Sequence, residues 1–62
     1  MISIGNAIKR INGLTDTKDL SSWENDFVRN IVEKSSNGDN TEDLSTKQVE
    51  IIMRIHNKHF EG

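Results

Sequence analysis

The chain contains no cysteine, no proline and no tyrosine, and only one tryptophan and two phenylalanines among its 62 residues. Without cysteine it can form neither a disulfide framework nor a thiolate metal site, and it has no thiol nucleophile. Small proteins of oxidising compartments usually depend on disulfides, so this absence favours a reducing cytoplasm. A chain of this length forms one domain at most, over residues 1–62, with a modest core.

Long apolar runs and a strong charge of either sign are also missing. No stretch approaches the roughly 18 apolar residues of a membrane span, and the first residues lack the basic and apolar pattern of a secretory signal. We therefore expect no membrane association. Eight Lys and Arg against ten Asp and Glu give a net charge of −2. This balance argues against general coating of DNA, which needs a positive excess.

The common catalytic patterns are absent from the sequence. It has no glycine-rich phosphate loop and no serine in a nucleophile elbow. Its paired carboxylates lie in polar segments of a chain with little room for a dry cleft. His56 and His59 stand three residues apart, without a third ligand at matching spacing. We expect no enzymatic activity, no metal site and no cofactor.

The most informative pattern present is Leu-Ser-x-x-Glu/Gln, which occurs at residues 20–24 and again at residues 44–48. In each copy a serine oxygen can accept from the amide three residues later, and the Glu or Gln there can reach back to the serine amide. Ser21 with Glu24, and Ser45 with Gln48, are therefore predicted helix caps. The two segments represent either a degenerate repeat or two capped amphipathic helices that look alike for shared physical reasons.

Apolar spacing predicts three helices, at about residues 3–12, 22–34 and 46–59. We expect an all-α fold, a small three-helix domain in which the second and third helices form an antiparallel hairpin. Gly13 is placed as the glycine that ends the first helix. The structural core is predicted to include Trp23, Phe27, Ile31, Val49, Ile52 and Ile55.

The segment 35–43 is predicted to be a flexible polar loop. It is rich in Ser, Asn and acidic residues, and Asn37-Gly38 is a turn signal. None of its side chains is expected to join the core.

Two features are candidates for binding. Lys47, Arg54 and Lys58 fall within about 40° of one another on the third helix, and this basic stripe is either a strip of nucleic-acid contacts or an ordinary solvated face. Lys9 and Arg10 would extend it if the first helix packs alongside. Trp23 can stack on a base or anchor a partner, although its four-residue spacing from the next aromatic favours the core.

A two-part motif spans about residues 20–58. The first part reads L-x-x-W-E-x-x-F-x-x-x-I, and the second reads L-S-x-K-Q-x-x-x-I-x-x-I; the residues are Leu20, Trp23, Glu24, Phe27 and Ile31, then Leu44, Ser45, Lys47, Gln48, Ile52 and Ile55. It resembles the short helical modules associated with phage helicases, among them small proteins that accompany the T4-type recombination helicase UvsW.

The resemblance implies a non-catalytic accessory module in phage DNA recombination, repair or replication. Such a module would dock onto a helicase or other DNA-processing protein in the cytoplasm of the bacterial host. Any ATPase activity would belong to that partner, since the sequence has no helicase motifs. The alternative is a weak direct nucleic-acid binder that uses the basic stripe.

Overall fold

The computed structural model describes residues 2–60, which form three α-helices. They are α1 (Ile4–Asn12), α2 (Ser22–Lys34) and α3 (Thr46–Phe60). No strand is found within the described range. The predicted all-α class is therefore confirmed. The bounds of α2 agree with the prediction, α1 begins one residue later, and α3 ends one residue later.

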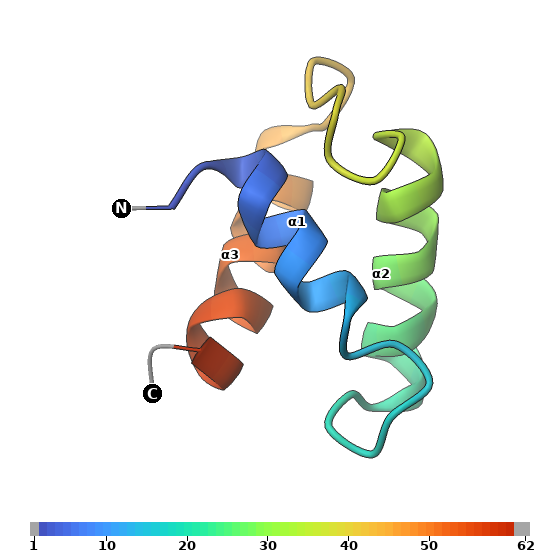
Figure 1. Ribbon diagram of the computed structural model, residues 1–62. Helices are drawn as coiled ribbons and strands as arrows, with labels where there is room; N and C mark the ends of the chain where they lie inside the picture. Colours follow the sequence, from blue (N-terminus) through green and yellow to red (C-terminus); the bar gives the residue numbers. More distant parts are fainter. Residues whose placement is uncertain (1, 61–62) are drawn as a thin grey trace.

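Helix α1 is the central element of the fold. Figure 1 shows α2 and α3 running in opposite directions on either side of α1, which packs against both and more extensively against α3. Ala7, Ile8 and Ile11 of α1 are fully buried between its neighbours. Direct packing of α2 on α3 as a hairpin is not confirmed, because α1 occupies most of the space between them.

The core is predominantly aliphatic. Its buried members are Ala7, Ile8, Ile11, Leu20, Val28, Ile31, Ile52 and Ile55. Three of the predicted core residues, Ile31, Ile52 and Ile55, belong to it, while Phe27 and Val49 are partly buried. The prediction for Trp23 is wrong, because 61% of its surface is exposed.

Both capping boxes form. The Glu24 amide donates to Ser21 Oγ at 3.2 Å, and Glu24 Oε1 accepts from the Ser21 amide at 3.0 Å. In the second box the Gln48 amide donates to Ser45 Oγ at 3.1 Å, and Gln48 Oε1 accepts from the Ser45 amide at 2.9 Å. Each box satisfies two amides that a helix start leaves without partners, and a cap of this kind stabilises a helix by about 1 kcal/mol.

The C-terminal ends of α1 and α2 are not closed by a left-handed glycine. Gly13 has φ −65°, so it continues the right-handed turn and is not the left-handed residue that ends α1. At the end of α2 the left-handed position is taken by Ser36, with φ 52°. There the Asn37 amide donates to the Val32 carbonyl at 2.8 Å, which is the long bond of a Schellman motif.

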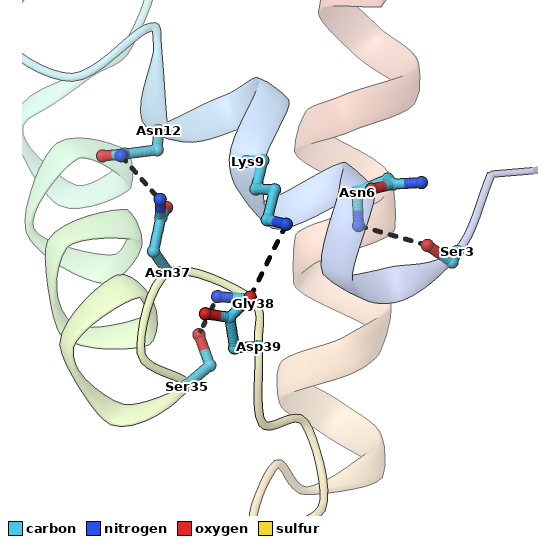
Figure 2. A network of polar contacts seen from close by, with 8 residues as sticks. All are labelled: Ser3, Asn6, Lys9, Asn12, Ser35, Asn37, Gly38 and Asp39. Carbon is cyan, nitrogen blue, oxygen red and sulfur yellow. Dashed lines mark hydrogen bonds and ion pairs between the residues drawn. The ribbon is translucent and has the colours of Figure 1, made fainter.

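Within the segment 35–43, residues 37–39 lie against α1 (Figure 2). Ser35 is fully buried, so the expectation that no side chain of this segment joins the core is wrong at its first residue. Gly38 lies against Gly5 so closely that a Cβ added to Gly38 would be 2.5 Å from the Gly5 carbonyl oxygen. Glycine at both positions therefore permits a direct backbone contact between the loop and α1.

None of the helices in residues 2–60 has the length and apolar character needed to cross a membrane.

Candidate interaction surface

The largest exposed aromatic side chain lies in the first turn of α2. The Trp23 ring stacks on Phe27, with 5.5 Å between the ring centroids and 8° between the ring planes. Phe27 in turn packs against the buried core. Trp23 is therefore an exposed indole resting on a partly buried neighbour, and one of its faces is covered by a fixed contact.

The helical phase explains why Trp23 lies outside the core. Val28 and Ile31 are the buried residues of α2 and define its inner face. Each residue of a helix advances by about 100° around the axis. Trp23 lies eight residues before Ile31, so its side chain points about 80° away from the direction of Ile31. Glu24 lies seven residues before Ile31, so its side chain points within about 20° of the direction of Ile31. The Glu24 side chain is accordingly only 16% exposed, and the inner position of the first turn belongs to the capping residue.

Glu24 links the start of α2 to the end of α3. Its Oε2 lies 3.9 Å from Lys58 Nζ. The Ser21 amide that donates to the carboxylate lowers the pKa of Glu24 below its usual value, while burial acts in the opposite direction. The Ser21 hydroxyl, Lys58 and His59 also lower this pKa. The carboxylate form is therefore favoured by the same contacts that cap the helix.

A second exposed aromatic side chain, Phe60, lies at the end of α3. It is 43% exposed and stacks on His56 with 5.2 Å between ring centroids. The Arg10 guanidinium carbon lies 6.0 Å from the Phe60 centroid, within cation–π range. This cluster joins the last turn of α1 to that of α3, and nothing in the local sequence of either helix predicts it.

The buried imidazole of His56 is part of the same cluster. Arg10 Nη1 lies 3.3 Å from His56 Nε2, and His56 Nδ1 lies 3.1 Å from Asn57 Oδ1. Since a guanidinium only donates, Nε2 accepts, and the ring proton assigned to Nδ1 donates to Asn57. Both ring nitrogens therefore have partners without a metal ion.

The predicted basic stripe is exposed, but one of its three residues is in an ion pair. Lys47, Arg54 and Lys58 are all exposed on α3. Lys58 is the residue paired with Glu24, whereas Lys47 and Arg54 form no ion pair within residues 2–60. Lys9 and Arg10, the predicted extension onto α1, already have intramolecular partners: Lys9 lies 3.6 Å from Asp39, and Arg10 contacts His56 and Phe60.

The described part of the chain forms no enclosed site. Among residues 2–60, no pocket is detected, and no group of three or more His, Asp or Glu side chains is placed to hold a metal ion. His56 is fully buried and His59 partly buried. The chemically distinctive features of the described surface are thus the exposed aromatic rings and the short basic stripe.

Comparison of the chain with protein-family models, with curated proteins and with solved structures finds no match. The resemblance to helicase-associated modules therefore rests on the motif residues alone.

Proposed function

We propose that the chain is a non-catalytic accessory module of phage DNA recombination, repair or replication, acting in the cytoplasm of the bacterial host. It docks onto a helicase or another DNA-processing protein through the aromatic surface formed by Trp23 and Phe27. The observation that carries this proposal is the exposure of Trp23. Tryptophan is enriched among the residues that dominate protein–protein binding energy, and a ring already fixed by stacking loses little freedom on binding.

The motif residues support a binding role for Trp23 in particular. Glu24 caps α2 and Phe27 packs on the core, so both have structural roles. Trp23 is in the same motif, yet most of its ring is exposed to solvent. An accessible tryptophan next to residues that fix the helix start is the arrangement expected of a docking anchor.

The proposal is tested by affinity capture from phage-infected cells, with and without nuclease, using tagged wild-type protein and Trp23→Ala and Trp23→Phe variants. We expect the wild type to retain a helicase or another DNA-processing protein, identified by mass spectrometry, after nuclease treatment. Trp23→Ala should weaken the complex remade from purified proteins by at least about 2 kcal/mol, the range of a dominant interface residue. Trp23→Phe should lose less, because it keeps an aromatic ring.

The proposal fails if no DNA-processing protein is retained, or if folded Trp23→Ala binds the retained protein as tightly as the wild type. Far-UV circular dichroism of each variant establishes that it is folded.

A second candidate function is weak direct binding of nucleic acid through Lys47, Arg54 and Lys58. It is favoured by the lack of an intramolecular ion pair at the first two residues within the described range. Opposing it are the net charge of −2 and the pairing of Lys58 with Glu24. At most three phosphate contacts would form, so affinity would be low and would fall steeply with salt.

This candidate is tested by NMR titration with single-stranded and duplex oligonucleotides at low salt. Binding should shift α3 signals, with a log–log salt slope of roughly −0.7 to −0.9 per phosphate contact. Replacement of all three residues by glutamine should abolish the shifts and leave helicity unchanged. A lack of shifts in the wild type at low salt removes this candidate, and loss of the captured partner on nuclease treatment would favour it.

A further inference from the structure

The fold brings together the only two Asn-Gly dipeptides of the chain, Asn12-Gly13 and Asn37-Gly38. Figure 2 shows Asn12 at the end of α1 facing Asn37 in the loop, and Asn12 Nδ2 donates to Asn37 Oδ1 at 3.2 Å. Asparagine before glycine is the sequence in which the side-chain amide reacts most readily with the following backbone nitrogen, because glycine has no Cβ to obstruct the approach.

The reaction needs only water. The backbone nitrogen of Gly38 loses its proton and attacks Cγ of Asn37, forming a new C–N bond, and the side-chain nitrogen leaves as ammonia. Water then opens the resulting five-membered succinimide at either carbonyl. The product is aspartate or, with one additional atom in the main chain, isoaspartate.

In the structure the attacking nitrogen is engaged. The Gly38 amide donates to Ser35 Oγ at 3.0 Å, and Ser35 Oγ donates to the Ile31 carbonyl at 2.6 Å. Because Ser35 is fully buried, its hydroxyl is a fixed acceptor for Gly38. The proton that must leave before the attack is thus held in a hydrogen bond, while the side-chain amide of Asn37 is held by Asn12.

Two further contacts hold residues 38 and 39 against α1. Lys9 lies 3.6 Å from Asp39 across the interface with α1. The Gly38 backbone contacts the Gly5 backbone with no room for a Cβ on either residue. A longer main chain between residues 37 and 38 would shift Gly38 relative to Gly5, and a carboxylate at position 37 would add charge next to Asp39.

From this geometry we propose that Asn37 is a self-modification site controlled by the packing of residues 37–39 on α1. The packed loop suppresses deamidation, an opened loop undergoes it, and the isoaspartate product prevents the loop from packing again. Deamidation thereby releases the loop irreversibly. Asn12 is protected separately, because it belongs to the last turn of α1, where the Gly13 amide donates to the Arg10 carbonyl at 3.1 Å. This inference is independent of the proposed function.

The first experiment compares deamidation of the wild-type protein in native buffer and in urea at the same mildly alkaline pH, by peptide mapping that distinguishes isoaspartate. We expect similar rates at Asn12 and Asn37 in urea. In native buffer Asn37 should react at least tenfold more slowly than in urea, a factor that corresponds to about 1.4 kcal/mol of opening free energy. Asn40, which precedes a threonine in the same loop, is the internal control and should react slowly in both conditions.

Two variants test the mechanism. Ser35→Ala removes the acceptor for the Gly38 amide, and Asn12→Ala removes the partner of the Asn37 side chain. Ser35→Ala should accelerate native deamidation at Asn37 but not at Asn12. If Ser35→Ala does not fold, as judged by circular dichroism, Asn12→Ala replaces it as the deciding variant and should accelerate the reaction at Asn37.

A third measurement addresses the product. In protein already converted to isoaspartate at position 37, the amides of Gly38 and Asn40 should exchange with solvent faster than in the unmodified protein. Equal rates at Asn37 in native buffer and in urea, no acceleration in a folded variant, or unchanged exchange in the product would each overturn the proposal.

Discussion

Substitution of Trp23 by alanine should reduce the free energy of unfolding far less than the burial of a tryptophan would require. About two-fifths of the Trp23 surface is covered. Full burial of a tryptophan covers roughly 200 Å², worth about 5 kcal/mol at about 25 cal/mol per Å². Two-fifths of this is about 2 kcal/mol, which is an upper bound because the unfolded chain already covers part of the ring. The higher helix propensity of alanine offsets about 0.5 kcal/mol.

The expected loss for Trp23→Ala is therefore about 1–2 kcal/mol, compared with about 3–5 kcal/mol for a tryptophan in a core. Ile31→Ala provides the matched comparison, because Ile31 lies on the same helix and is fully buried. Its truncation should cost about 2–5 kcal/mol. The smaller side chain is thus expected to contribute more to stability than the larger one.

Urea unfolding followed by far-UV circular dichroism measures both variants. Fluorescence is unsuitable for the comparison because Trp23 is the only tryptophan in the chain. The midpoints should fall in the order wild type, Trp23→Ala, Ile31→Ala, with similar slopes. A loss of 3 kcal/mol or more for Trp23→Ala (the core range), or a loss above that of Ile31→Ala, would refute the exposed position of the ring and remove the basis for its role as an anchor.

Three further substitutions follow from the backbone and the caps. Ser36→Gly should stabilise the protein by up to about 1 kcal/mol in urea unfolding, because Ser36 is left-handed with φ 52°; an unchanged or lower midpoint would contradict this. Gly38→Ala should destabilise by more than about 1 kcal/mol, since it combines φ 91° with a Cβ 2.5 Å from the Gly5 carbonyl oxygen. Gly13→Ala is the control and should cost less, because φ is −65° and the added Cβ would be 3.3 Å from the Arg10 carbonyl oxygen. Because folding lowers the pKa of Glu24, its carboxylate stabilises the folded protein. This stabilisation is complete above the pKa that Glu24 has in the unfolded chain, and it is lost as the pH falls through the pKa of Glu24 in the folded protein. Glu24→Gln keeps a capping oxygen without this titration, so its unfolding midpoint should depend less on acidic pH than that of the wild type; equal dependence would contradict the assignment.

The features that the sequence predicts well are those set by neighbouring residues. The boxes at Ser21 and Ser45 each depend on side chains three positions apart, so their spacing alone specifies the hydrogen bonds. The bounds of α2 follow from such a cap and from a continuous apolar period. The aliphatic core residues Ile31, Ile52 and Ile55 could be predicted for the same reason.

The error at Trp23 also has a local cause and was avoidable. A strict four-residue spacing drifts by about 40° at each step, so an aromatic residue two steps before a buried residue need not share the buried face. A phase set by Val28 and Ile31 would have placed Glu24 inward at the first turn. The sequence contains this information, because the phase set by Val28 and Ile31 is a better guide to the buried face than the four-residue register of Trp23, Phe27 and Ile31.

The contacts between α1 and the loop could not be predicted in this way. Gly5 and Gly38 are 33 positions apart, and no local pattern links them. The buried position of Ser35 likewise depends on the Schellman end of α2 and on the place of α1 against it. A polar composition predicts solvation for the whole loop, whereas the Gly38 backbone packs against Gly5 and the buried Ser35 hydroxyl accepts from the Gly38 amide.

The central position of α1 affects how the two-part motif can function. The motif begins at Leu20 and does not include α1, yet Ala7, Ile8 and Ile11 form the part of the core between the two motif helices. A fragment starting at Leu20 would expose the inner faces of α2 and α3, which have little direct packing with each other. The motif residues therefore need α1 to hold Trp23 and the basic stripe in fixed positions, and binding experiments on the motif should use the full chain. Loss of binding in such a fragment would report loss of the fold and not loss of a recognition residue.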